Sequence, residues 1–327
     1  MTRLEHNTPA LISDTPVWCI AGPTAAGKSA LCTKIADILP AEFINVDSAT
    51  IYQGMDIGTA KPDAEERSRL KHHLLDIVDP AQAYSVARFY DDATRLIAEI
   101  QARDHLPILV GGTMMYYHTL MHGLAELPSA DPAVRMQIEA QALQIGWPAM
   151  HQKLVQVDPD TAARLAPADK QRIGRALEVY QMTGKPLSVW LQSQTTPRPA
   201  IPLRLISLEP SERQKLHHRI EMRFDEMLEQ GLLDEVQALY QRGDLSPELP
   251  SIRCVGYRQM WPVITGEEDL KSAREKAIIA TRQLAKRQMT WLRSMPERMA
   301  VDCLDPSNAH QEILQALQSD LSKHTQN

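Results

Sequence analysis

Apolar residues along the chain form short runs that alternate with longer amphipathic stretches. Four runs bounded by glycine, proline or polar residues predict buried strands: VWCIA (17–21), EFINVD (42–47), PILVGG (107–112) and PLRLISLEP (202–210). Between them, apolar positions recur at helical spacing, as in residues 28–39 and 85–103. Strands that alternate with helices predict βαβ units, and therefore a mostly parallel sheet covered by helices on both faces.

The alternation of strand and helix signals stops between residues 123 and 198. This segment is rich in helical patterns and is punctuated by prolines, so we interpret it as a helical insertion domain. After Pro210 the patterns are helical, and we expect no further strand. The expected organisation is a core domain at 13–122 and 199–316, interrupted by the insertion at 123–198. A short disordered leader is expected before the first strand.

Composition and charge narrow the class of protein. Hydrophobic residues make up 43% and charged residues 23%, as in ordinary globular proteins, and no apolar run could span a membrane or serve as a signal peptide. The four cysteines show no C-x-x-C spacing, which argues against a zinc site and favours the reducing cytoplasm. The net charge of −6 argues against indiscriminate coating of nucleic acid. Residues 271–293, however, carry seven basic side chains and one glutamate, and this local charge of +6 requires a partner.

A phosphate-binding motif follows the first predicted strand and opens a helix. The sequence GPTAAGKS (22–29) has the spacing of a P-loop, in which backbone N–H groups and the helix N-terminus bind phosphate oxygens. Gly22 and Gly27 allow the tight path, Lys28 supplies positive charge, and Ser29 can bind Mg²⁺. We expect the whole loop to hold a phosphate group: Gly22, Pro23, Thr24, Ala25, Ala26, Gly27, Lys28 and Ser29. The expected fold class is therefore α/β, with a P-loop NTPase-like sheet.

The acidic residue at the end of the second predicted strand points to a transferase. A nucleotide hydrolase needs a strand-end carboxylate to support Mg²⁺, but the strand at 107–112 is followed by Thr113. The acid lies instead after the second strand, at Asp47. Nucleoside and small-molecule kinases place an acid there as the base for an acceptor hydroxyl. The alternative interpretation of Asp47 is a helix N-cap.

Longer segments carry a family resemblance. They occur in the order INVDSATIYQGMDIGTAKP, HHLLDIVDP, PILVGGTMMYYHTLMHGL, QRIGRALEVYQMTGKPLS, LPSIRCVGYRQM and ATRQLAKRQMTWLR. Over about residues 17–295 the chain resembles the tRNA dimethylallyltransferases, or tRNA isopentenyltransferases, in their bacterial form. The resemblance implies transfer of the prenyl group of dimethylallyl diphosphate to the exocyclic amine of an adenosine. That adenosine is the one 3′ of the anticodon, in tRNAs that read codons starting with U.

The resemblance also implies roles at the site, with Asp47, Thr24, Arg223 and Lys28 as catalytic residues. Asp47 would hydrogen-bond the weakly nucleophilic amine and take its proton. Arg223, Lys28 and Mg²⁺ on Ser29 would stabilise the leaving diphosphate, and Thr24 would lie near both reactants. The target base would have to be flipped out of its stack. The implied partners are dimethylallyl diphosphate and the anticodon stem-loop of tRNA, bound by a monomer.

Residues expected to contact tRNA by this resemblance lie in both domains. They are Asp47, Ser48, Ala49, Thr50, Gln53, Thr113, Arg135, Gln171, Arg172, Ile173, Gly174, Arg175, Arg253, Cys254, Val255, Gly256, Tyr257, Arg258, Arg282, Lys286, Arg287 and Arg293. Arg282, Lys286 and Arg293 fall within about 40° on one helical face, which is either a phosphate-binding face or only a solvated one. We expect the basic C-terminal helix and the insertion to hold the anticodon stem-loop from opposite sides.

Two other function classes remain open at this point. A nucleotide or nucleoside kinase would share the P-loop, the strand-end acid and arginine-bearing helices. A nucleotide-driven RNA-binding switch would share the P-loop and the basic segment. Such a switch also needs a second strand-end carboxylate, which this chain lacks after the strand at 107–112. Phosphoryl transfer from ATP would favour the kinase, and RNA-stimulated nucleotide turnover would favour the switch.

Overall fold

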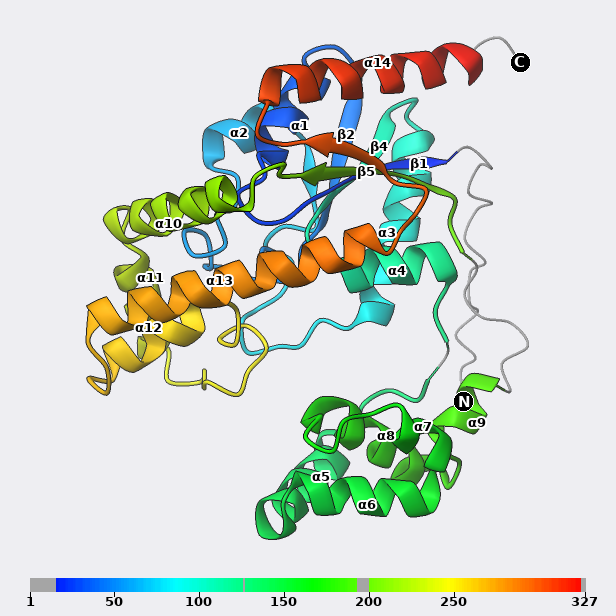
Figure 1. The fold of residues 1–327 in the computed structure, drawn as a ribbon, viewed down its shortest axis with the longest axis vertical. Helices are drawn as coiled ribbons and strands as arrows, with labels where there is room; N and C mark the ends of the chain where they lie inside the picture. The colour runs from blue at the N-terminus through cyan, green and yellow to red at the C-terminus, as the bar shows by residue number, and fades with distance from the viewer. Residues whose placement is uncertain (1–15, 126, 193–199, 325–327) are drawn as a thin grey trace. The chain divides into compact units, whose positions relative to one another are not determined.

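A computed structural model describes residues 16–125, 127–192 and 200–324 of the chain (Figure 1). The expected N-terminal leader and the expected domain boundaries at 13 and 198–199 lie outside these residues. Contacts divide the chain into two units. The insertion unit is Gly123–Ala200, and the core unit contains the chain before it, to His122, and after it, from Ile201.

The core unit is built on one parallel sheet of six strands in the order β3-β2-β4-β1-β5-β6. The strands are β1 (Val17–Ala21), β2 (Ala41–Val46), β3 (His72–His73), β4 (Leu106–Gly111), β5 (Leu203–Glu209) and β6 (Met299–Asp302). The four predicted strands are all present and all parallel. The expectation of no strand after Pro210 is wrong, because β6 pairs with β5, with Met299 opposite Ile206. This edge strand has four residues and buries only Val301 fully, so its apolar pattern is weak.

Helices cover both faces of the sheet, as predicted (Figure 1). The side chains of the strands alternate between the two layers. Val17, Cys19 and Ala21 of β1 face one core, and Trp18 and Ile20 face the other. The first core is closed by α3 (Val86–Gln101), α4 (Met114–His122) and the end of α13 (Leu270–Arg293). The second is closed by α1 (Lys28–Ala36) and α14 (Pro306–His324), with α2 (Ala64–Arg69) beside it. The α/β class with a P-loop NTPase-like sheet is confirmed.

A third core supports the loops beyond the sheet. It joins α10 (Arg213–Glu229), α11 (Leu232–Gln241), α12 (Tyr257–Ile264) and the first half of α13. Ile51, Tyr52, Met55 and Val78 pack into it, so the long segment that follows Asp47 is anchored by apolar contacts. This packing explains how a segment with little regular structure holds a defined position.

The described residues of the insertion unit form five helices. They are α5 (Pro132–Ile145), α6 (Trp147–Val157), α7 (Pro159–Ala163), α8 (Lys170–Thr183) and α9 (Leu187–Gln192). Pro132, Pro148 and Pro159 occupy first-turn positions, where a missing N–H has no cost, so these prolines start helices rather than break them. Ile138, Leu154 and other apolar side chains form a core within the unit.

Three loops meet at the carboxyl edge of the sheet, because parallel strands all end on the same side. Residues 22–29 follow β1, Asp47 follows β2, and residues 112–113 follow β4, which lies between the other two strands. Among the described residues, no helix has the length and apolar character needed to cross a membrane.

Candidate active site

The loop at residues 22–29 has the geometry of an anion cradle at a helix N-terminus. Gly27 precedes α1 in the left-handed conformation, at φ 85°, which glycine adopts without strain. The Lys28 Nζ donates to the carbonyl oxygens of Gly22 and Pro23, both at 3.0 Å, so the ammonium lies folded against its own loop. Burial lowers the pKa of Lys28 to about 8, although nearby Asp47 acts in the opposite direction. The loop therefore offers a partly desolvated cation and backbone N–H groups to a phosphate.

Asp47 and Thr113 are held together at the ends of β2 and β4. The Asp47 Oδ1 accepts the N–H of Ala49 at 2.9 Å in a tight turn, and no helix begins there, so the N-cap alternative is wrong. The Ser48 N–H donates to the Thr113 Oγ1 at 3.0 Å. The Thr113 N–H in turn donates to the carbonyl of Val46 at 3.0 Å. These bonds fix the backbone on both sides of the Asp47 carboxylate.

Arg223 of α10 completes a charged group with Asp47 and Lys28. Burial lowers the pKa of the Arg223 guanidinium, and Glu226 and Asp47 oppose that shift. Because Asp47 influences the pKa of both cations, the three groups lie within electrostatic reach of one another. The electrostatic influence of Asp47 and Arg223 therefore reaches the phosphate loop at Lys28.

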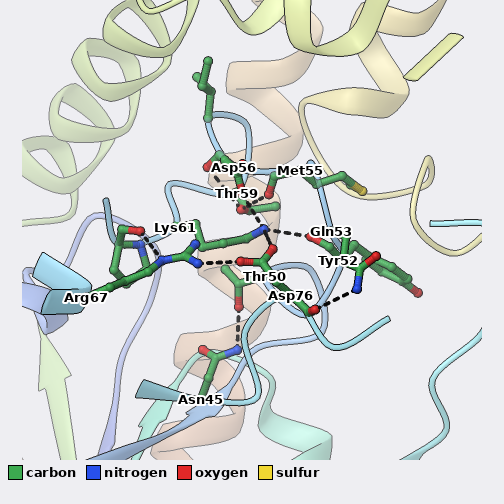
Figure 2. A network of polar contacts seen from close by, with 12 residues as sticks. Asn45, Thr50, Tyr52, Gln53, Met55, Asp56, Thr59, Lys61, Arg67 and Asp76 are labelled. Carbon is green, nitrogen blue, oxygen red and sulfur yellow. Dashed lines mark hydrogen bonds and ion pairs between the residues drawn. The ribbon is translucent and has the colours of Figure 1, made fainter. Parts of the chain in front are cut away.

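The segment that follows Asp47 is pinned by a buried lysine that the sequence did not single out (Figure 2). The Lys61 side chain is fully buried, and its Nζ bonds the carbonyl of Tyr52 at 2.7 Å, Asp56 at 2.6 Å and Asp76 at 2.5 Å. Arg67 binds the other oxygen of Asp76 at 2.6 Å. The ammonium thus ties three points of the segment together. The position of Lys61 within the GTAKP motif is the feature of the sequence that could have marked it as important.

A second anchor, Glu235 of α11, also escaped the sequence reasoning. Its carboxylate accepts the consecutive N–H groups of residues 56–58 at 2.7, 2.8 and 3.0 Å. It also accepts the Tyr257 hydroxyl at 2.5 Å. Nothing in the sequence marks a glutamate on an ordinary amphipathic helix as the partner of residues so far away.

The residues expected to contact tRNA differ widely in exposure. The side chains open to solvent are Ser48, Gln53, Arg135, Gln171, Arg172, Arg253, Arg258, Lys286, Arg287 and Arg293. Those that are half-buried are Asp47, Ala49, Thr113, Gly174, Arg175, Cys254, Val255 and Arg282. Gly256 is buried. Three of these residues have buried side chains: Thr50 is enclosed against Asn45, Ile173 lies in the core of the insertion unit, and Tyr257 is fully buried.

The basic character of α13 is partly neutralised within the protein. Arg274 bonds Asp225 at 2.5 Å, Lys276 bonds Glu268 at 2.5 Å, and Arg282 bonds Glu221 at 3.1 Å. Of the three residues on the expected phosphate-binding face, Arg282, Lys286 and Arg293, Arg282 is therefore already paired with an acid. Lys286 and Arg287 are exposed, and neither has an ion pair within the described part of the chain.

The insertion unit presents arginines that are oriented by acids. Buried Glu178 accepts Arg135 at 3.3 Å and Arg175 at 3.0 Å, and Arg172 bonds Asp169 at 2.7 Å. Arg135 and Arg172 remain more than half exposed. These pairs hold the guanidinium groups on one side of α8 without removing them from solvent.

The donor groups at the phosphate loop suit Mg²⁺. Among the described residues no cluster of three or more His, Cys, Asp or Glu side chains could hold a metal by itself. Mg²⁺ usually keeps several waters and takes substrate phosphate oxygens with few protein ligands. The exposed hydroxyl of Ser29 at the start of α1 fits that need.

Comparison with known proteins gives one consistent family. A family model described as IPP transferase matches residues 50–295. The tRNA dimethylallyltransferase of Bordetella petrii is 60% identical over 294 residues, which covers 89% of this chain and 94% of that protein. The corresponding protein of Ralstonia pickettii is 55% identical over 314 residues, with 94% and 96% covered.

Solved structures agree with the sequence relatives. The tRNA isopentenylpyrophosphate transferase of Bacillus halodurans superposes with a TM-score of 0.68 at 37% identity, covering 95% of this chain and 98% of that one. A eukaryotic dimethylallyltransferase acting on tRNA superposes with a TM-score of 0.79 at 28% identity, covering 95% and 80%.

Proposed function

The chain belongs to the IPP transferase family, the tRNA dimethylallyltransferases, and from this premise we propose that it transfers the dimethylallyl group of dimethylallyl diphosphate to tRNA. The observation that carries the proposal is that the phosphate loop after β1 and Asp47 after β2 lie at the same carboxyl edge of the sheet, in a chain of this family. Family membership removes the nucleotide kinase and the RNA switch as interpretations.

The acceptor we propose is the exocyclic amine of the adenosine 3′ of the anticodon, in tRNAs that read codons starting with U. The amine nitrogen forms a bond to the first carbon of the prenyl group while the carbon–oxygen bond to the diphosphate breaks. Asp47 accepts the proton that the amine loses, and its carboxylate is held in place by the Ala49 N–H. The diphosphate leaves with the electron pair of the broken bond.

Negative charge that develops on the diphosphate is stabilised by the phosphate loop. Lys28 exchanges its bonds to the loop carbonyls for phosphate oxygens, and Arg223 supplies a second cation. Thr24 lies in the same loop, and we assign it a place near both reactants. Mg²⁺, which we place on Ser29, would supply further charge neutralisation when bound.

We further propose that the anticodon stem-loop is the bound part of the tRNA. The exposed residues of segments 48–53, 171–175 and 253–258, together with Arg135, Lys286, Arg287 and Arg293, present the hydrogen-bond donors and positive charge that phosphates require. The target adenine has to leave its stack to reach Asp47. We place the protein in the cytoplasm, acting as a monomer.

A direct transfer assay tests the proposal. Purified protein is incubated with dimethylallyl diphosphate, Mg²⁺ and an anticodon stem-loop RNA, and the nucleosides are analysed by mass spectrometry. Prenylated adenosine is expected, and it should be absent when the adenosine 3′ of the anticodon is replaced by guanosine. Loss of the gene should remove prenylated adenosine from cellular tRNA. Phosphoryl transfer from ATP without any prenyl product would contradict the proposal.

A further inference from the structure

A buried glutamine of α13, Gln288, lies between the phosphate loop and the loop that follows β4. Gln288 is only 7% exposed and shares the core-facing side of the helix with Ala285, Met289 and Leu292. A polar side chain in such a position has a large cost unless its hydrogen bonds are made. The groups that Gln288 bonds therefore indicate its role.

Both polar atoms of Gln288 bond backbone groups of the site. The Nε2 donates to the carbonyl of Gly112 at 2.8 Å, and the Oε1 accepts the N–H of Thr24 at 3.3 Å. These two partners fix the orientation of the amide, because a flipped amide would set donor against donor and acceptor against acceptor. One side chain thus links the phosphate loop to the loop after β4.

On the donor side, Gln288 holds the peptide unit between Pro23 and Thr24. The carbonyl of that unit accepts the Lys28 Nζ at 3.0 Å and the N–H of Ala26 at 3.3 Å. Its N–H is the group that Gln288 binds. Rotation of this peptide would break the contacts at both ends, so Gln288 fixes the loop conformation in which Lys28 lies.

On the acceptor side, Gln288 holds Gly112. The N–H of Gly112 donates to the carbonyl of Val46 at 3.1 Å, one residue before Asp47. A Cβ atom on Gly112 would lie 2.3 Å from the Gln288 Nε2, so a side chain at this position would displace the amide. The chain of contacts runs from Thr24 through Gln288 and Gly112 to the backbone that carries Asp47.

This link connects the loops of two strands that do not pair with each other. β1, which leads to the phosphate loop, and β2, which leads to Asp47, do not pair, because β4 lies between them. We propose that Gln288 is a positioning residue that sets the donor loop relative to the acceptor carboxylate. The inference rests on the proposed function, since it concerns the distance between the two reactants.

The first test replaces the amide with a side chain of similar length. In Gln288→Met both hydrogen bonds are lost, and we expect kcat at saturating substrates to fall on the order of 10- to 100-fold, because small displacements of reacting groups have effects of this size. The Kd for the anticodon stem-loop should stay within about twofold, because the buried amide does not reach RNA. Gln288→Glu keeps an acceptor for the Thr24 N–H but sets a second acceptor against the Gly112 carbonyl, so its kcat should stay as low as that of Gln288→Met.

The matched control is Gln283→Met, an exposed glutamine on the same helix, which should leave kcat and Kd unchanged. A Gln288→Met protein that folds and keeps the parent kcat would overturn the positioning role. A loss confined to RNA affinity would also overturn it. If the parent protein transfers no prenyl group, the proposed function itself fails, which is a different result from an active parent with an indifferent Gln288.

A second pair of variants keeps the test informative if Gln288→Met unfolds. Gly112→Ala alone should lower the Tm, because its methyl group would collide with the Gln288 amide. Gly112→Ala combined with Gln288→Ala removes that collision and should regain Tm, while kcat stays low because the link is absent. Recovery of the parent kcat in the double variant would show that the link has no part in the reaction.

Discussion

Asp47 is the residue at which binding and chemistry can be separated most directly. In Asp47→Asn an amide oxygen can still accept the Ala49 N–H, but the side chain cannot take a proton. We expect kcat to fall about 10²- to 10⁴-fold, the usual contribution of a general base, with donor Kd within about threefold. Single-turnover prenyl transfer and donor titration measure the two quantities. Near-normal turnover at saturating tRNA would show that Asp47 is not the base.

The lowered pKa of Lys28 predicts that use of the diphosphate donor weakens at alkaline pH. The pKa of Lys28 is lowered to about 8, so the ammonium that binds diphosphate is fully present below that pH and is lost as the pH rises through it. We expect kcat/KM for the donor to decline above about pH 8. In Lys28→Arg the guanidinium stays charged, so the decline should move to higher pH even if the overall rate is lower. An identical alkaline limb in both proteins would assign it to another group.

Single residues also show how far sequence reasoning could reach. The phosphate loop and Asp47 were predictable, because each follows a strand directly and belongs to a local motif. A family motif identifies a segment but not which of its side chains face inward, so the burial of Tyr257 and Ile173 was not predictable. Glu235 and Gln288 act on groups far away in the sequence. Gln288 left a local signal, as a polar residue within an apolar helical stripe.

At the scale of elements, α13 carries mostly paired basic side chains in its first half and two exposed basic side chains without an ion pair among the described residues in its second half. Its first turns use their charge on Asp225, Glu268 and Glu221, whereas Lys286 and Arg287 are exposed near its end. We expect Lys286→Ala/Arg287→Ala to weaken tRNA binding and to reduce the slope of log affinity against log salt by about 0.7 to 0.9 per lost contact. Donor affinity should not change. Filter binding at several salt concentrations measures this slope for the parent and for the variant.

The control for this variant removes the same charge from the same helix. Lys271→Ala/Lys276→Ala lies at the start of α13, where Lys276 is paired with Glu268. Its salt slope should match the parent. Equal slopes in both double variants and the parent would show that the end of α13 is only a solvated surface.

Elements were predictable where their patterns were long. The sixteen-residue α3 has a clear apolar face and a Ser85 cap, and the structure places it within two residues of its predicted bounds at both ends. β3 and β6 were missed because two- and four-residue strands at the sheet edges carry too little periodicity to register. Their pairing is decided by neighbours in space.

Across the whole molecule, the two ends of the sheet have different tasks. The carboxyl edge carries the proposed active site, and the amino edge carries an ionic cluster around the buried Glu42 at the start of β2. The Glu42 carboxylate bonds Arg103 at 2.8 Å, His73 at 2.7 Å, His105 at 2.9 Å and Lys71 at 3.1 Å. It joins β2, β3 and the segment between α3 and β4, far from the phosphate loop in the topology of the sheet.

This cluster should stabilise the fold without affecting catalysis. Burial alone would raise the pKa of Glu42, but the hydrogen bonds from Arg103, His73 and Lys71 lower it to about 2. The stabilisation is therefore complete above the ordinary glutamate pKa and is lost as the pH falls from about 4.5 towards 2. We expect Glu42→Gln to lower the free energy of unfolding by about 3 kcal/mol at neutral pH, with kcat unchanged. Urea denaturation should show that difference shrinking in acid, and a constant difference would rule out the titration of Glu42 as its source.

The strand order has a consequence for the synthesis of the chain. β1 is made first, but β5, one of its two neighbours, emerges from the ribosome only after the whole insertion unit. The helices of that unit make local contacts, so they can collapse while β1 is still an open edge of an incomplete sheet. A nascent chain at this stage exposes an apolar strand edge that other chains could pair with. Translation through β5 is thus the step that ends the period of greatest aggregation risk.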